Sequence, residues 1–183
     1  MSRTPQAVVV GSGPNGLAAA ITLARAGWRV SVQEGAGEVG GALRSGELTL
    51  PGFVHDLGSA VHPLAAASPF LRGLPLHRHG LEWVQPDVPL GHPLPGGTSA
   101  LLHRSLEQTA EELGADGPAY RALLEPLVRH WPDLLDETLR PLLHFPAHPV
   151  TLARFGLRGL WPASVAVRAL FGTPGARALL AGL

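Results

Sequence analysis

The 183-residue chain contains no cysteine and no lysine. Without cysteine it can form no disulfide bond, no thiolate zinc site and no cysteine nucleophile. This composition fits an ordinary reducing compartment, and we expect a cytoplasmic protein. The 14 basic residues are all arginine and are balanced by 14 acidic residues, so the net charge favours neither nucleic acid nor an acidic substrate as a partner.

Long apolar runs and metal-ligand patterns are also missing. No stretch of about 18 apolar residues occurs, and the N-terminus lacks the pattern of a cleaved signal peptide, so neither a membrane span nor a leader is predicted. Nine histidines are present, but His77 and His79 are only two residues apart, and Pro146 separates His144 from His148. Without cysteine or a carboxylate at ligand spacing, we expect no bound metal.

The N-terminal residues predict a strand, a helix and a second strand. Residues 7–10 form a short β-branched run that ends at Gly11, and residues 17–26 hold Leu, Ala and Ile at helical density before Gly27. Apolar and polar residues then alternate over 28–34, as they do in a strand. Elements in this order form a βαβ unit with a parallel sheet, so we predict an α/β fold of the Rossmann type.

Beyond this unit the composition changes. Gly, Pro and His are frequent over residues 35–95, and the apolar runs at 53–57 and 81–84 are short, which predicts loops and brief strands. Helical patterns dominate the remainder of the chain. We therefore expect two domains, a Rossmann-type portion at residues 1–104 and a helical segment at residues 105–183.

Capping residues and spacing predict the helices of the second half. Ser105 with Gln108 three residues later is typical of a capping box. A helix is expected over 116–140, kinked or broken because Pro126 and Pro132 each remove a backbone donor. The further helical pieces expected are 150–155, 163–171 and 175–180, the last with Thr173 as its N-cap and Pro174 as its first residue.

The C-terminal part carries charge of one sign. Between Thr138 and Leu183 there is no acidic residue, and the arginines there are Arg140, Arg154, Arg158, Arg168 and Arg177. Three interpretations stay open: a solvated basic face, a contact surface for further chain or an oligomer partner, and a surface that lies on a membrane. Because the chain ends within the apolar helical pattern 178–183, we expect it to be a truncated piece of a longer protein.

The segment GSGPNG, residues 11–16, fits the pattern G-x-G-x-x-G between the first strand and the helix. In this setting Gly11 permits the tight turn, Gly13 lets the backbone approach a pyrophosphate, and Gly16 lets the helix pack closely on the strand. The helix N-terminus then faces the phosphates with unpaired N–H groups and the positive end of its dipole. The turn therefore predicts a bound dinucleotide.

An acidic residue stands where the second strand is expected to end. The Glu34 carboxylate can accept hydrogen bonds from the hydroxyls of an adenosine ribose. Its charge would repel a 2′-phosphate, so NADP is disfavoured at this site. The turn and the acid together leave FAD and NAD as candidate cofactors.

Two further stretches resemble a known group of flavoproteins. In EGAGEVGGALRSG, residues 34–46, the acid is followed by a Gly-Gly turn with an arginine three residues beyond it. This pattern resembles the N-terminal motif of the superfamily of amine oxidases and phytoene (carotenoid) desaturases, and most of all the phytoene dehydrogenase-related NAD(P)/FAD-dependent oxidoreductases. The likeness continues in LPGFVHDLGSAVHP, residues 50–63, where Asp56, Gly58 and Ser59 match an Asp-x-Gly-Ser core.

The resemblance implies FAD as the cofactor and transfer of a hydride equivalent to the flavin from an apolar or amine-like substrate. It also implies that Gly41, Ala42 and Arg44 lie along the FAD pyrophosphate and the flavin, and that His62 lies near the ring. No residue is assigned a catalytic role. The residues expected to bind the cofactor are Gly11, Ser12, Gly13, Pro14, Asn15, Gly16, Glu34, Gly40, Gly41, Ala42, Arg44, Ser59 and His62.

The chain departs from this superfamily in length. Its members typically have several hundred residues, and their C-terminal Gly-Asp segment has no match here, so the chain would hold the ADP-binding portion and the start of a substrate or cap region. Two alternatives stay open. One is an NAD-binding Rossmann dehydrogenase, which leaves the Gly-Gly turn unexplained. The other is a truncated, non-catalytic dinucleotide-binding module whose Arg-rich C-terminal part needs a partner chain or a membrane.

The expected partner is a small, apolar substrate. Nucleic acid is not expected as a partner, because basic patches with interleaved aromatic residues are absent.

Overall fold

The computed structural model describes residues 3–141 and 143–182. The chain divides into two compact units, Met1–Leu81 and Glu82–Leu183. This division comes earlier in the chain than the expected boundary between residues 104 and 105. The reason is that the hairpin of β5 (Leu90–Pro93) and β6 (Ser99–Leu102) packs against helices of the C-terminal unit. The functional division into 1–104 and 105–183 stays a prediction.

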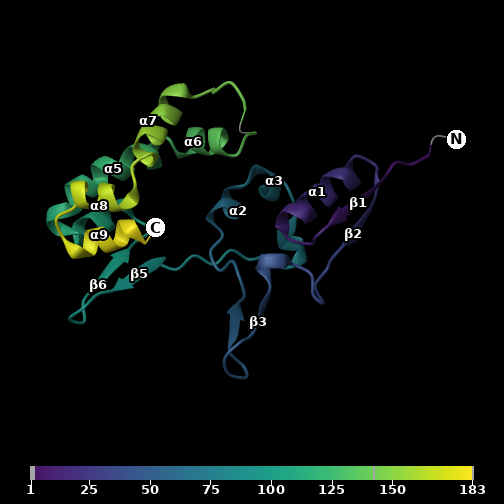
Figure 1. Ribbon diagram of the computed structural model, residues 1–183, viewed down its shortest axis with the longest axis horizontal. Coiled ribbons are helices and arrows are strands. Elements are labelled where there is room, and N and C mark those ends of the chain that lie inside the picture. The colour runs from purple at the N-terminus through teal and green to yellow at the C-terminus, as the bar shows by residue number, and fades with distance from the viewer. Residues whose placement is uncertain (1–2, 142, 183) are drawn as a thin grey trace. The chain divides into compact units, whose positions relative to one another are not determined.

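The N-terminal unit begins with the expected βαβ arrangement (Figure 1). It consists of β1 (Gln6–Val10), α1 (Pro14–Arg25) and β2 (Arg29–Gln33). The two strands pair in parallel, with Val10 of β1 opposite Gln33 of β2. The helix starts earlier than apolar spacing alone predicts, because proline suits the first helical position, where no N–H is needed. An α/β fold of the Rossmann type is confirmed.

Short elements follow, as expected for a segment rich in Gly and Pro. β3 and β4 pair antiparallel, and β4 lies within the predicted run 53–57. The run 81–84 forms no strand. The elements of this segment are η1 (Gly41–Leu43), β3 (Ser45–Glu47), β4 (Val54–Asp56), α2 (Pro63–Ala67), α3 (Pro69–Arg72) and η2 (Leu76–His79).

Only one face of the parallel sheet is covered within the described part of the N-terminal unit. Helix α1 packs on the face that carries Val9, and Ala20 of that helix is buried. Val8 and Val10 point to the opposite face and are exposed. Parallel strands are usually buried on both faces. Val8 and Val10 therefore form an apolar sheet face that no element within residues 3–81 covers.

The C-terminal unit has a small core of its own. β5 and β6 form an antiparallel hairpin, and α9 and α4 pack against it. The buried core residues are Ala100, Ala110, Tyr120, Phe171, Ala176 and Leu179. The helices are α4 (Leu106–Glu112), η3 (Gly114–Asp116), α5 (Gly117–Arg129), α6 (Trp131–Thr138), α7 (Pro149–Gly159), α8 (Ala163–Leu170) and α9 (Pro174–Ala181).

Both predicted N-caps form, and the helix expected over 116–140 is broken into two. The Ser105 hydroxyl accepts a hydrogen bond from the Gln108 N–H, and Thr173 caps α9. Pro126 lies inside α5 without ending it, so the expected break does not fall at that residue. A helix can continue past a proline when only one hydrogen bond is lost and the turns on either side are packed. The break comes at His130, and α6 then carries a proline in its first turn.

A buried carboxylate joins the start of α5 to the start of α9. Asp116 accepts hydrogen bonds from the N–H of Gly172 at 2.9 Å, the N–H of Thr173 at 2.8 Å and the hydroxyl of Thr173 at 2.6 Å. These donors, with Gly172 first, hold the pKa of Asp116 below its usual value. The ionised carboxylate therefore fixes the position of α9 within this unit. No helix in residues 3–141 and 143–182 is long and apolar enough to cross a lipid bilayer.

Candidate dinucleotide-binding site

The third glycine of the turn lies against the backbone of the first. A Cβ atom built on Gly16 would lie 2.2 Å from the carbonyl oxygen of Gly11 and 3.6 Å from Cγ1 of Val9. No side chain can occupy that position unless the backbone moves. Gly16 therefore permits the close packing of α1 on β1 that the sequence pattern predicts.

The chain turns at Gly11 and enters α1 at Gly13. Gly11 has φ +93° and donates its N–H to the carbonyl of Gln33 at 2.7 Å, which joins the turn to the end of β2. Gly13 is the N-cap of α1 and has no side chain to accept from the first helical N–H groups. A Cβ on Gly13 would meet no atom within 4 Å. The start of α1 therefore offers uncapped donors and open space, which an anion can use.

Ser12 and Glu34 form the centre of the site. The N–H and the hydroxyl of Ser12 both donate to Oε2 of Glu34, at 2.8 and 2.5 Å, and the N–H of Ala36 donates to Oε1 at 3.0 Å. Ser12 is only 3% exposed. These bonds, that of the Ser12 hydroxyl above all, lower the pKa of Glu34 to about 2. The carboxylate is therefore ionised and held in a fixed orientation.

The Gly-Gly turn packs directly on the first turn. The hydroxyl of Ser12 accepts a hydrogen bond from the N–H of Gly40 at 3.1 Å. Gly41 has φ +59°, and a Cβ there would lie 3.0 Å from Cα of Gly13. Two segments that are separated in sequence thus meet backbone to backbone. Ser12 connects them, since it donates to the acid and accepts from the second turn.

The remaining predicted residues continue the same network. Nε of Arg44 donates to the carbonyl of Gly41 at 3.0 Å, which leaves the terminal nitrogens of the guanidinium for other partners. The N–H of Ser59 donates to the carbonyl of Ala42 at 2.8 Å, and its hydroxyl lies 3.3 Å from Nδ1 of His62. The structure therefore brings the two turns, Arg44 and the Ser59–His62 pair into one region of the N-terminal unit.

Pro14 and Asn15, in the first turn of α1, are exposed. Proline has no N–H, so Pro14 cannot donate a hydrogen bond to a phosphate. Its fixed φ angle instead favours the start of the helix at this residue. The assignment of all these residues to cofactor binding stays a prediction.

Sequence reasoning did not foresee what Ser12 and Gly58 do. Ser12 counted only as part of the phosphate turn, yet it is the buried residue through which the acid and the Gly-Gly turn are connected. A Cβ on Gly58 would lie 2.8 Å from the carbonyl oxygen of Ala42, so this glycine lets the chain after β4 approach η1. The Asp-x-Gly-Ser pattern was a signal for Gly58, whereas no sequence signal identified the hydrogen bonds of Ser12.

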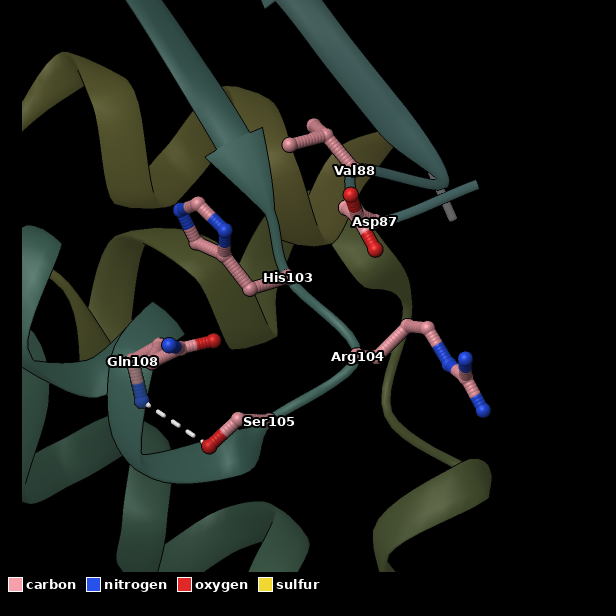
Figure 2. A pocket seen from close by; sticks show the side chains of 6 residues that line it. All are labelled: Asp87, Val88, His103, Arg104, Ser105 and Gln108. Carbon is pink, nitrogen blue, oxygen red and sulfur yellow. Dashed lines mark hydrogen bonds between the residues drawn. The ribbon is translucent and has the colours of Figure 1, made fainter. Parts of the chain in front are cut away.

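A separate pocket lies in the C-terminal unit and includes none of the predicted cofactor residues. It is an open cavity of about 700 Å³. Figure 2 shows the side chains around it, with Arg104 pointing away from His103 and the Ser105 hydroxyl bonded to the backbone of Gln108. His103 in turn pairs with Glu112. We assign no function to this pocket.

The described residues contain no group of three or more histidine or acidic side chains placed to hold a metal ion. Ionised Glu34, the uncapped start of α1 and the arginine of the Gly-Gly turn are the charged features of the candidate site. Together they can accept hydrogen bonds from ribose hydroxyls and donate hydrogen bonds to phosphate oxygens.

Comparison with known proteins agrees with this geometry. Residues 9–74 match the family model of a NAD(P)-binding Rossmann-like domain. Over 134 residues, 73% of this chain, the sequence is 32% identical to one of the subunits of limonene dehydrogenase from Castellaniella defragrans. The chain spans about a quarter of that relative's length, 24%. The N-terminal part of the chain is therefore a Rossmann-like domain of the kind that binds a dinucleotide cofactor.

Proposed function

We propose that this chain is the ADP-binding portion of an FAD-dependent oxidoreductase of the phytoene desaturase-like type. The observation that carries this proposal is the packing of the Gly-Gly turn on the phosphate turn through Ser12 and Gly13. A dinucleotide site built from the βαβ unit alone needs only the first turn and the acid. The second turn adds a cation, Arg44, to the same region.

The residues present fit FAD in three respects. Gly41 has no Cβ that would meet Gly13 in the other turn, Gly13 leaves open space beside it, and the first turn of α1 has no side-chain cap. Glu34 is ionised and can accept from the ribose of the ADP moiety. Arg44 would pair with a phosphate, and the Ser59–His62 pair would lie toward the flavin. When bound, FAD supplies a ring that accepts a hydride equivalent from substrate.

We further propose an apolar substrate. The relative in Castellaniella defragrans is named as part of a limonene dehydrogenase, and limonene is a hydrocarbon. A C–H bond in such a molecule has no charged neighbour, so the enzyme must position it by shape and by exclusion of water. The chain spans about a quarter of that relative's length, and we assign no catalytic residue within it.

A second candidate is an NAD-binding Rossmann dehydrogenase. The matching family is described as NAD(P)-binding, which favours this candidate. The two proposals differ in their use of Arg44, because an NAD site formed by the first turn and Glu34 does not need the Gly-Gly turn. FAD and NADH should therefore respond differently to the loss of this arginine.

The test is an absorbance spectrum of the purified chain followed by separate titrations with FAD and with NADH. We expect FAD to bind more tightly than NADH, and R44M to weaken FAD binding by at least about tenfold, since a charge-assisted contact with phosphate is lost. R72M is the matched control, because Arg72 is an exposed arginine of the same unit outside the site. Tighter binding of NADH, or equal FAD binding by R44M and R72M, would favour the second candidate.

A further inference from the structure

Neither hydrogen-bond donor of Ser12 is free to contact a ligand. A serine residue has two protons to donate, one on its backbone nitrogen and one on its hydroxyl. Both are donated to Oε2 of Glu34, at 2.8 and 2.5 Å. Ser12 is also almost fully enclosed by the protein, at 3% exposure. Its contacts are therefore with the protein itself, although it lies in the turn that is expected to face a phosphate.

The oxygen of the same hydroxyl holds the Gly-Gly turn. It accepts a hydrogen bond from the N–H of Gly40 at 3.1 Å. In the described part of the chain, this is the one hydrogen bond between residues 11–16 and residues 40–44. The other hydrogen bonds of residues 40–44 stay within that segment or run to residues 57–59. Loss of the hydroxyl therefore removes the hydrogen bond that joins the two turns and leaves the other bonds of the Gly-Gly turn in place.

Arg44 takes its position from this turn. Its Nε donates to the carbonyl of Gly41 at 3.0 Å. The backbone of the turn is left-handed, with φ +112° at Gly40 and +59° at Gly41, and this conformation sets the direction of that carbonyl. A Cβ on Gly40 would lie 3.3 Å from Cγ of Arg44, so the stem of the arginine lies along the turn. A shift of Gly40 therefore shifts the guanidinium that we propose to pair with a phosphate.

Glu34 depends less on the hydroxyl of Ser12. Without that hydroxyl, the carboxylate still accepts from the N–H of Ser12 on Oε2 and from the N–H of Ala36, at 3.0 Å, on Oε1. The pKa of Glu34 would rise from about 2 toward its ordinary value of 4.5, so the acid stays ionised at neutral pH. The first turn and Glu34 therefore keep their charge and most of their contacts, whereas the Gly-Gly turn loses its link to them.

We propose that Ser12 is a positioning residue that sets the preference of this site for FAD over NADH. Its hydroxyl holds the Gly-Gly turn on the phosphate turn, and this contact places the guanidinium of Arg44 to pair with a phosphate of FAD. NADH, which would use the first turn and Glu34, does not need that placement. The inference rests on the proposed function, and it assigns to Ser12 an action through Arg44 and not a contact with the cofactor.

The test is separate titration of S12A with FAD and with NADH. We expect FAD to bind at least about fivefold more weakly than to the unsubstituted chain, and NADH to bind within about twofold of it, because the lost hydrogen bond positions only the Gly-Gly turn. S68A is the matched control. The Ser68 hydroxyl also accepts from a backbone N–H of the same unit, that of Leu71, at 3.4 Å and outside the site. This control should bind both ligands as the unsubstituted chain does.

A double-mutant cycle with R44M tests whether Ser12 acts through Arg44. In the R44M background, S12A should change FAD binding by less than about twofold, because the group that the hydroxyl positions is already absent. A purely structural loss would instead weaken FAD binding in both backgrounds, and it would weaken NADH binding as well.

Amide hydrogen exchange of Gly40 tests the contact in the unsubstituted chain, so it does not depend on the folding of any variant. FAD should slow exchange of the Gly40 N–H by at least about fivefold, because the cofactor fixes the Gly-Gly turn, whereas saturating NADH should leave the rate within about twofold. Without ligand, Gly40 should exchange faster in S12A than in S68A.

The results separate this inference from the proposed function. Tighter binding of NADH than of FAD by the unsubstituted chain would overturn both. In a chain that prefers FAD, equal losses of FAD and NADH binding in S12A would overturn only the role of Ser12. An effect of S12A on FAD binding that persists undiminished in R44M, or equal protection of Gly40 by the two ligands, would also overturn that role alone.

Discussion

Substitution of Gly16 by alanine tests the central packing contact of the Rossmann-like domain. The added methyl group would lie 2.2 Å from the carbonyl oxygen of Gly11, well inside van der Waals contact. The neighbour is backbone, so no rotation of a side chain can relieve the overlap. Either α1 moves away from β1 or the turn at Gly11 opens.

Two opposing effects decide the size of the change. Alanine is favoured over glycine in a helix by about 1 kcal/mol. Overpacking of a close contact costs about 1–3 kcal/mol, and the upper part of this range applies where only backbone can yield. We therefore expect G16A to lower the free energy of unfolding of the N-terminal unit by about 1–2 kcal/mol.

The matched control is G156A in α7. Gly156 is also helical, but a Cβ there would meet no atom within 4 Å. This variant should gain up to about 1 kcal/mol from helix propensity alone. Urea unfolding followed by circular dichroism measures the stability, and amide hydrogen exchange of α1 shows whether the loss in G16A lies in the N-terminal unit.

A stability of G16A equal to or above that of the unsubstituted chain would refute this reasoning. It would mean that the turn moves at little cost, so the close approach of α1 and β1 is not the reason for a glycine at this position. Equal losses in G16A and G156A would point instead to a general effect of alanine on these helices.

Three other predictions concern hydrogen-bonded acids. S12A should raise the pKa of Glu34 from about 2 toward its ordinary value, because its largest stabilising bond is lost, and a carbon NMR titration that finds the same pKa would contradict this. D116N should lower the urea midpoint of the C-terminal unit at neutral pH, because an amide oxygen cannot accept all three hydrogen bonds, and an unchanged midpoint would show that Asp116 does not hold α9 in place. In the unsubstituted chain, this unit should lose stability when the pH falls below the ordinary pKa of an aspartate and the carboxylate becomes protonated. The hydrogen bond with Glu137 is the chief cause that raises the pKa of His144. The protonated ring therefore stabilises the fold fully below the ordinary pKa of histidine, and this stabilisation is lost as the pH rises through the raised pKa. A proton NMR titration of the ring should show the raised pKa in the unsubstituted chain and a lower pKa in E137Q.

Local patterns in the sequence predicted much of the fold. A β-branched run, a glycine turn and an alternating run are enough to specify a parallel βαβ unit, because each element depends on residues close to it in the chain. The caps at Ser105 and Thr173 formed for the same reason, since a capping side chain bonds within its own turn. The helix expected over 116–140 is broken as predicted, at His130, although Pro126 itself lies inside α5.

The residues of the candidate site also differ in whether the sequence alone could identify their part in it. Its glycines and Glu34 could be identified from spacing, because the turn and the strand end that carry them are local. The bridge from Glu34 through Ser12 to Gly40 joins three segments, and no spacing within one segment reveals it. The close approach of Gly41 to Gly13 likewise depends on how two turns pack.

The sequence alone determined the Rossmann-like class, the position of the phosphate turn and the one-sided charge of the C-terminal part. These follow from residue type and short spacing, which act before distant segments meet. Only the tertiary structure decided that Ser12 connects the two turns, that the chain divides into units after Leu81, and that Glu137 turns His144 inward. The physical reason is that all three features depend on contacts between residues of different elements. Such contacts form only once those elements have packed together.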